Sequence, residues 1–213
     1  PEPARHIAVK SPVFSFAKMM DVDVSLGPEM KSTGEVMGID YSYDRSLYKA
    51  MLSAGVKIPP TDGHMLVTIA DKDKEECIDL LGRFAKLGYT FTATPGTAEF
   101  LRGQGFEVES CSKIGEDRPD IIDLIYSGKV DMLMNTLTPD PEVEKDGQKI
   151  RRATVELDIP CMTSLDTALA LLLALEGYRQ AGGRSFSFFP VNHYMRDAET
   201  ARKIAAWKSD YLF

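Results

Sequence analysis

From residue 65 to 178, short apolar segments alternate with amphipathic segments, and this alternation constrains the fold more than any other feature of the chain. The apolar segments have the length of strands, and the amphipathic ones repeat apolar residues at helical spacing. Such an order requires right-handed crossovers, which give a mainly parallel sheet with helices on both faces. The sequence therefore predicts an α/β fold with a five-stranded sheet. Its strands are predicted at 65–70, 89–93, 105–110, 130–135 and 159–162.

Signals for helix starts and stops lie between these strands. Asp73 and Glu76 have the spacing of a capping box, and apolar residues then recur on one helical face until Gly88. Asp117 opens a further helix with Pro119 in its first turn, where the missing N–H does no harm. After the fourth strand the pattern predicts a charged loop at 139–149 and helices at 150–157 and 164–178.

Residues 89–98 read YTFTATPGTA and predict a strand, a tight turn and the start of a helix. Gly96 allows the backbone to approach a ligand closely, and Thr94 and Thr97 place two hydroxyls at the helix N-terminus. Free N–H groups and the helix dipole favour an anion at such a position. The turn therefore predicts a phosphate site. The alternative is that Thr97 only caps the helix.

Polar residues also follow the other predicted strands. Parallel sheets bind ligands beyond the carboxyl ends of their strands, so residues that follow different strands meet at one rim. The polar residues that follow the strands are mostly hydrogen-bond donors or positively charged, although the chain is acidic overall. This favours a phosphorylated small molecule as partner. The alternative for each residue alone is a solvated loop position. The set is Lys74, Thr94, Thr97, Lys113, Asn135 and Thr136.

Composition argues against several other classes of protein. A formal net charge of −7 and a pI near 5.1 do not suit a nucleic-acid-binding surface, which needs clustered positive charge. The longest apolar run, 169–175, is far shorter than the roughly 20 residues that span a bilayer. The 3 cysteines and 3 histidines lack metal-ligand spacing, which favours reduced thiols and no metal site. With no secretory signal, the chain is expected to be cytoplasmic.

The pattern is different before the Pro- and Gly-rich break at 56–63. Strand character at 7–16 is interrupted by a proline, which favours an edge strand. Residues 21–38 are polar and rich in glycine, and 44–54 predict one short helix. These elements are too few to bury much surface alone, so they should pack on the domain that follows or on a missing body. The chain starts without an initiator Met and is expected to be a piece of a longer protein.

The run GPEMKSTGEVMG at 27–38 resembles, nearly residue for residue, a segment near the end of the second ATP-grasp unit in the large subunit of carbamoyl-phosphate synthetase. The resemblance implies that residues 1–57 are the C-terminal remnant of this unit. The family's metal ligands and ATP contacts would lie upstream, so this chain should hold no cofactor and make no carbamoyl phosphate. The parent enzyme would use ATP with Mg²⁺ or Mn²⁺, bicarbonate and glutamine-derived ammonia, for pyrimidine and arginine synthesis.

Residues 60 to about 180 resemble the methylglyoxal-synthase-like domain that ends the same large subunit, which implies that 58–213 form an allosteric domain. In the bacterial family this domain binds UMP as inhibitor and IMP as activator. The implied partners are a nucleotide effector, the remainder of the large subunit and the glutaminase small subunit. The aromatic-rich residues 186–213, with a helical stretch at 198–211, favour a packing or interface element. Matched by motif, Lys74, Thr94, Thr97 and Lys113 hold the effector phosphate, and Asn135, Thr136, Asp146 and Ile150 hold the nucleoside.

Several positions depart from the bacterial pattern. Leu137 stands where another threonine is expected, and the loop before Asp146 is one residue longer, which leaves the preferred base open. The carboxylates expected to bind ornithine are replaced by Ser11 and Met162. A cationic amino acid needs an acidic partner, so control by ornithine is expected to be weak or absent.

Two other functions remain open at this point. A methylglyoxal synthase eliminates phosphate from dihydroxyacetone phosphate and needs a carboxylate base beside the phosphate site. Asp117 is the nearest candidate, but it aligns only across a gap, and without the gap Arg118 takes its place. The other alternative is an interaction module that uses the same fold without a small ligand. Charge reversal at Lys74 and Lys113 separates the last alternative from a phosphate site.

Overall fold

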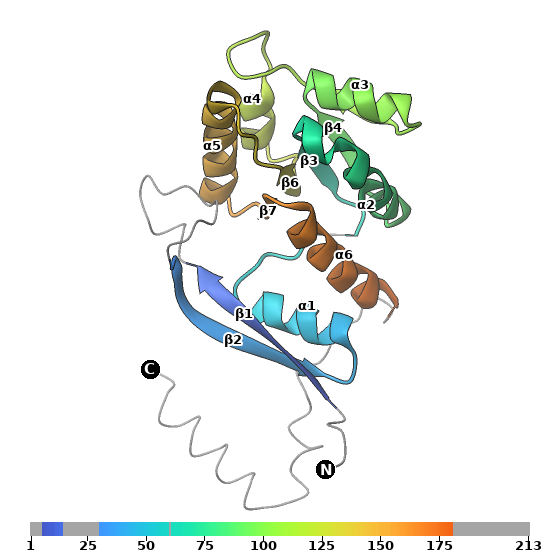
Figure 1. The fold of residues 1–213 in the computed structure, drawn as a ribbon, viewed down its shortest axis with the longest axis vertical. Coiled ribbons are helices and arrows are strands. Elements are labelled where there is room, and N and C mark those ends of the chain that lie inside the picture. Colours follow the sequence, from blue (N-terminus) through green and yellow to red (C-terminus); the bar gives the residue numbers. More distant parts are fainter. Residues whose placement is uncertain (1–5, 15–29, 60, 181–213) are drawn as a thin grey trace, which may run out of the picture.

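The computed structural model of the chain describes residues 6–14, 30–59 and 61–180. A sheet flanked by helices lies at one end, and a two-stranded hairpin lies toward the other (Figure 1). The aromatic-rich tail with its predicted helix at 198–211 is outside the described residues, as are the first three residues of the run at 27–38.

The larger sheet consists of β3 (His64–Thr68), β4 (Thr90–Ala93), β5 (Val108–Ser110), β6 (Met132–Asn135) and β7 (Cys161–Met162). All neighbouring strands are parallel, and their order is β5-β4-β3-β6-β7. The order reverses at β3, because β4 pairs with one edge of this strand and β6 with the other. The predicted α/β fold with a mainly parallel five-stranded sheet is confirmed.

Helices pack on both faces of this sheet, as the alternation predicts. They are α2 (Lys74–Lys86), α3 (Pro95–Gly103), α4 (Ile121–Tyr126), α5 (Pro141–Glu156) and α6 (Leu165–Gln180). Met65 and Val67 of β3 belong to a core with α2, α3 and α6, whereas Leu66 belongs to a core with α4 and α5. Each of these buried side chains contributes about 2 kcal/mol. Because all the strands are parallel, the polar residues that follow them lie at one edge of the sheet, the carboxyl edge.

The predicted capping box at the start of α2 does not form. Its N-cap residue, Asp73, makes no capping hydrogen bond through its side chain. Asp73 ends a 3-10 helix, η2 (Asp71–Asp73), and its backbone angles of φ −102° and ψ −5° are helical. A side chain caps a helix from an extended backbone, so the continuous turn takes the place of the box. The turn leads from β3 into Lys74, the first residue of α2.

Helix α4 begins later than the sequence predicts, at Ile121 and not at Asp117. Its cap is Asp120, whose carboxylate accepts two backbone N–H groups of the first turn. The Asp123 carboxylate accepts the backbone N–H of Asp120 in return. This reciprocal capping box fixes the start of the helix, so Pro119 lies before the helix and outside its first turn.

Residues 139–149 are not a loop, because α5 already begins at Pro141. Proline is tolerated at a first helical position, and the Glu and Lys residues that follow have good helix propensity. One side of this stretch faces solvent and the other faces a polar cavity, so apolar periodicity starts only at Ile150. The missing periodicity explains why the pattern predicted a loop.

The N-terminal unit consists of β1 (Ile7–Phe14), β2 (Ser32–Asp40) and α1 (Tyr43–Ser53). Its two strands pair antiparallel, and their register places Ile7 opposite Asp40. The strand at β1 and the helix at α1 were predicted. β2 lies in the glycine-rich segment, where the sequence shows no strand pattern. Pairing with β1 therefore stabilises this strand, and local propensity does not. The origin of the N-terminal unit as an ATP-grasp remnant stays a prediction.

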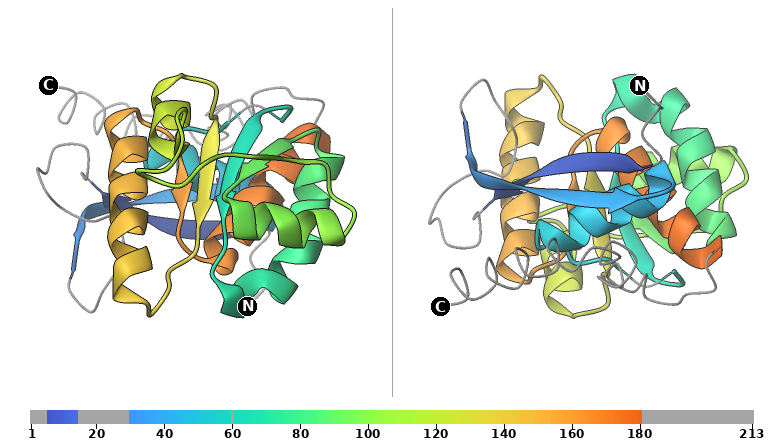
Figure 2. Two further views of the ribbon diagram at one scale, coloured as in Figure 1. Left: turned by 90° about the horizontal axis from the view of Figure 1, so that it is seen from above. Right: turned by 90° about the horizontal axis from the view of Figure 1, so that it is seen from below.

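The N-terminal unit packs on the α/β domain through α1 and α6. Helix α1 lies between the hairpin and α6 (Figure 1), and the view from below shows the hairpin and α1 in front of the domain (Figure 2, right). Leu47 and Tyr48 form a small buried core with Ala174 of α6. Tyr48 also stacks on Tyr178, with ring centroids 5.2 Å apart. The sequence left open whether this unit packs on the domain that follows or on a missing body. In the structure it packs on the domain that follows.

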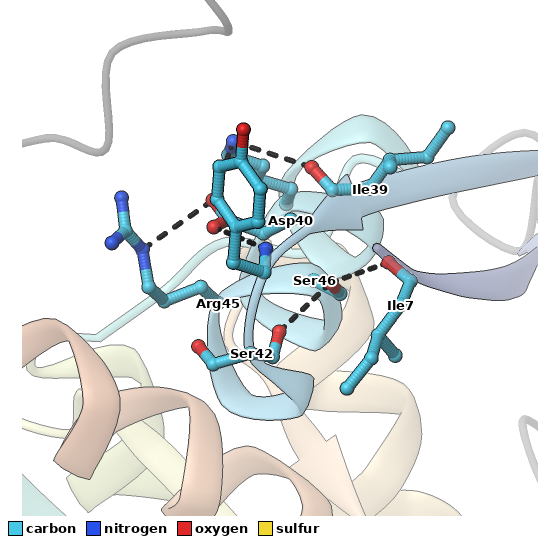
Figure 3. Close-up of polar contacts among 8 residues, drawn as sticks. Ile7, Ile39, Asp40, Ser42, Arg45 and Ser46 are labelled. Atoms are coloured by element: carbon cyan, nitrogen blue, oxygen red, sulfur yellow. Dashed lines mark hydrogen bonds and ion pairs between the residues drawn. The ribbon is translucent and has the colours of Figure 1, made fainter. Parts of the chain in front are cut away.

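A buried carboxylate joins β2 to α1 within this unit. Asp40 is only 2% exposed, and its Oδ2 lies 2.7 Å from Lys49 Nζ and 3.4 Å from Arg45 Nε. In α1, the Ser46 hydroxyl donates to the backbone carbonyl of Ile7 in β1, at 2.8 Å (Figure 3). A buried charge is tolerated when it is paired in this way, and removing its partner is strongly destabilising.

The pH dependence of stability should report this carboxylate. Burial alone would raise the pKa of Asp40, but hydrogen bonds from Lys49 and the Tyr41 N–H and the charges of Lys49 and Arg45 outweigh it, so the pKa lies below 3.8. A lowered pKa stabilises the fold above the unfolded pKa, and the effect is lost as pH falls through the folded pKa. We expect Asp40→Asn to cost about 2 kcal/mol at neutral pH, and the difference from wild type to shrink below about pH 4.

Urea unfolding of both proteins between neutral pH and about pH 3 measures this difference. A difference that stayed constant over the whole range would contradict the role given to the Asp40 carboxylate.

Candidate functional site

The carboxyl ends of the strands border one cavity, which we call the rim pocket. It has a volume of about 690 Å³, within the usual range for small-molecule sites, and residues after β3, β4, β5 and β6 line it. It lies where the strand order reverses, the usual ligand position in open α/β sheets. Nucleotide binding stays a prediction, but the structure brings all its predicted residues to this pocket. They are Lys74, Thr94, Thr97, Lys113, Asn135, Thr136, Asp146 and Ile150.

Lys74 brings a positive charge to the pocket from the first residue of α2. Its side chain is 20% exposed, and its Nζ lies 2.7 Å from Oδ1 of Asp71 and 5.7 Å from the centroid of the Phe100 ring. The hydrogen bond from Lys74 lowers the pKa of Asp71, which therefore stays ionised at neutral pH. An anionic ligand can compete with this exposed carboxylate for the ammonium group.

The N-terminus of α3 borders the same part of the pocket. Thr94 is its N-cap and makes no capping hydrogen bond through its side chain. A Cβ added at Gly96 would meet no heavy atom within 4 Å, so the backbone here faces open space. Lys113 lines the pocket from the loop after β5 and is exposed. Backbone N–H groups of a first helical turn, together with two ammonium groups, suit a phosphate.

Two threonine hydroxyls of the pocket lining, those of Thr97 and Thr136, accept hydrogen bonds from the protein. The backbone N–H of Ile69 donates to Thr97 Oγ1 at 3.3 Å, and the N–H of Ala70 donates to Thr136 Oγ1 at 2.8 Å. Thr97 is 4% exposed and Thr136 is 5% exposed. Each of their hydroxyl oxygens therefore accepts a hydrogen bond within the protein. The hydroxyl hydrogen remains for a ligand acceptor. This favours a ligand rich in acceptor oxygens over a ligand rich in N–H donors.

The opposite part of the pocket offers mixed chemistry. Asn135 is 6% exposed at the end of β6, and Ile150 provides an apolar surface from α5. Asp146 is more open, with a side chain 43% exposed and its Oδ1 2.9 Å from Lys149 Nζ. An amide, a carboxylate and an apolar side chain together can contact a ribose and a base.

The sequence assigned no role in the pocket to Thr68 and Glu144, which line it, or to Arg151, which is bonded to Asn135 and Glu144 of the lining. Arg151 is fully buried and is bonded to Asn135 and Glu144. Glu144 and Arg151 are seven positions apart, which is two helical turns on one face. That spacing is visible in the sequence, but it carries a signal only when 139–149 is recognised as helix.

Three other residues considered in the sequence do not line the rim pocket. Asp117 lies exposed in the loop before α4. Ser11 is in β1 opposite Val36, and Met162 is buried in β7. Neither the carboxylate proposed as a base nor the two positions considered for ornithine therefore belongs to this pocket.

The residues that the structure describes contain neither a metal-ligand cluster nor a membrane-spanning helix. Within those residues, no group of three His, Cys, Asp or Glu side chains is placed to hold a metal ion. No described helix has both the length and the apolar character to cross a bilayer. Among the described residues, Cys77, Cys111 and Cys161 form no disulfide. Burial raises the pKa of Cys77 and of Cys111 to about 11, so these two thiols stay protonated at neutral pH.

A comparison with protein families agrees with this geometry. The family model described as "MGS-like domain" matches residues 76–163. The match runs from α2 to the loop after β7 and includes all the predicted site residues except Lys74, which precedes it by two positions. The part of the chain that carries β4 to β7 and most of the predicted site residues is therefore similar to the MGS-like domain.

Proposed function

We propose that the rim pocket binds a nucleotide effector of the UMP or IMP type and that the chain is a regulatory region. The observation that carries this proposal is that Lys74, Lys113 and the N-terminus of α3 all line one cavity of about 690 Å³. The threonine hydroxyls beside them have hydrogens to donate. A phosphate with its charge and several acceptor oxygens satisfies this set, and the remaining volume suits a nucleoside.

The larger protein that we propose is the large subunit of carbamoyl-phosphate synthetase. Residues 1–57 would close its second ATP-grasp unit, and 58–213 would be its allosteric domain. Catalysis, with ATP and Mg²⁺ or Mn²⁺, would take place in the preceding parts, and ammonia would come from a cytoplasmic glutaminase subunit. Support comes from the run at 27–38 and from the similarity to the MGS-like domain. An effector regulates such an enzyme when it binds two states of the whole with different affinity.

Methylglyoxal synthase is the second candidate, because the MGS-like domain is compatible with both functions. Its reaction needs a carboxylate that removes a carbon-bound proton next to the bound phosphate. Asp117 is outside the rim pocket, and Asp120 has its carboxylate engaged in capping α4. Asp71 does line the pocket, 2.7 Å from Lys74, so a product assay and not the position of Asp117 separates the two candidates. An assay for methylglyoxal with dihydroxyacetone phosphate tests the second candidate directly.

Calorimetric titration of the chain with UMP tests the proposed function. We expect saturable binding in the millimolar range or tighter. Uridine, which lacks the phosphate, should bind at least about tenfold more weakly, because it loses charge-assisted hydrogen bonds. IMP titrated in parallel reports the base preference. Equal binding of UMP and uridine, or no heat with either nucleotide, would contradict a phosphate site.

A further inference from the structure

Arg151 is a buried cation directly behind the wall of the rim pocket. It belongs to α5, and its relative exposure is 0%. An arginine stays charged in any protein environment, so a buried one needs partners for its donors. Two of these partners, Asn135 and Glu144, are residues that line the pocket.

The contacts of Arg151 hold two different elements of the pocket. One terminal nitrogen donates to Oδ1 of Asn135 at 2.7 Å, and the other pairs with Oε1 of Glu144. Asn135 ends β6, whereas Glu144 lies in the first half of α5. The planar guanidinium therefore fixes the distance between the sheet rim and the helix wall.

The direction of the hydrogen bonds follows from the chemistry of arginine. A guanidinium only donates, so the Asn135 side-chain oxygen must face Arg151 and its NH₂ must face the other way. That NH₂ donates to Thr68 Oγ1 at 2.5 Å. The Thr68 hydroxyl is then an acceptor on the protein side, and its hydrogen is left for the pocket that Thr68 lines.

We propose that Arg151 is a positioning residue of the rim pocket. Through Asn135 it orients the Thr68 hydroxyl as a donor and ties α5 to the end of β6, and its ion pair with Glu144 within α5 balances the buried charge, so this part of the pocket selects a ligand acceptor atom. The inference rests on the proposed function, because it assigns the determinant of specificity within the same site.

Gly147 offers a test that removes no polar group. A Cβ added there would lie 2.9 Å from the Arg151 terminal nitrogen and 3.4 Å from Oδ1 of Asn135. Gly147→Ala should therefore displace the guanidinium from Asn135 while favouring the helix by its propensity. Gly82→Ala in α2 is the matched control, because its Cβ would meet only one atom, at 4.0 Å.

We expect Gly147→Ala to bind UMP about tenfold more weakly than wild type, and Gly82→Ala to bind it equally well. Arg151→Lys should show the same loss as Gly147→Ala, because a lysine keeps the charge but not the planar fork. A role in stability alone predicts changes in Tm. Because Gly147 itself lines the pocket, the positioning role predicts lost affinity in Gly147→Ala at a Tm within a few degrees of wild type together with the same loss in Arg151→Lys, which adds no atom to the pocket wall.

The side-chain NH₂ of Asn135 gives a readout that needs no ligand. In wild type its NMR signals should exchange slowly with solvent, because the side chain is buried, its NH₂ donates to Thr68 and its oxygen accepts from Arg151. In Gly147→Ala they should exchange faster. Unchanged exchange and affinity in Gly147→Ala would overturn the positioning role and leave the proposed function standing. A wild-type chain that binds no UMP would overturn both, and the two failures are thus distinguishable.

Discussion

Reversing the charge of Lys74 and Lys113 together is expected to raise the Kd for UMP at least a hundredfold. Each lysine should lose a charge-assisted hydrogen bond worth about 1.5–3 kcal/mol, and each new carboxylate adds repulsion. Lys74 should contribute more than Lys113, because its side chain is only 20% exposed and is thus less screened by solvent. Titration of Lys74→Glu, Lys113→Glu and the double variant with UMP measures the effect.

The matched control is Lys57→Glu with Lys129→Glu. Both lysines are exposed and outside the rim pocket, and this pair changes the net charge by the same amount. We expect its affinity to stay within about twofold of wild type, since charges beyond a Debye length of roughly 10 Å are largely screened. If both double variants lost affinity equally, the cause would be net charge. If neither did, the pocket would not be a phosphate site, and an interaction module would become the better interpretation.

The polar side of the rim pocket could be predicted because a parallel sheet brings all its carboxyl ends to one edge. Lys74 and Thr94 follow β3 and β4, and Asn135 ends β6, yet the three residues line one cavity. To predict that these residues share a cavity, it is enough to locate the ends of the strands in the sequence. The conformations of the loops are not needed. The alternation between residues 65 and 178 marked those ends to within a few residues.

The wall formed by α5 could not be found in this way. Its first half has charged residues toward solvent and toward the pocket, so it lacks the apolar stripe that identifies a helix. Arg151 is fully buried in spite of its charge, because Asn135 and Glu144 satisfy its donors. Such pairing depends on residues from separate elements, and no local pattern reports it.

β2 escaped prediction for a related reason. Its two glycines and its polar residues interrupt the strand pattern, and the strand exists because β1 pairs with it and α1 packs on it. The glycine that looks like a loop signal is a packing requirement. At Gly38 the backbone of the strand touches the backbone of α1 directly, with no room for a side chain.

Gly38→Ala is therefore expected to destabilise the N-terminal unit by about 3 kcal/mol or more. A Cβ added at Gly38 would lie 2.1 Å from the carbonyl oxygen of Ser46 and 2.4 Å from the backbone nitrogen of Ala50. Both are main-chain atoms of a helix and cannot rotate away as a side chain would. The strand and helix must separate, which weakens the ion pair between Asp40 and Lys49 as well.

Hydrogen exchange of the α1 amides measures this loss, and Gly34→Ala is the control in the same strand. A Cβ at Gly34 meets no heavy atom within 4 Å, so its cost should stay below about 1 kcal/mol. UMP affinity should change little in Gly38→Ala, because the rim pocket contains no residue of β2 or α1. Equal protection of α1 in the two variants would mean that β2 does not pack on α1 as closely as described. Loss of UMP binding together with loss of α1 protection would instead reveal energetic coupling between the N-terminal unit and the rim pocket, which is what an effector site needs in order to act on a catalytic body.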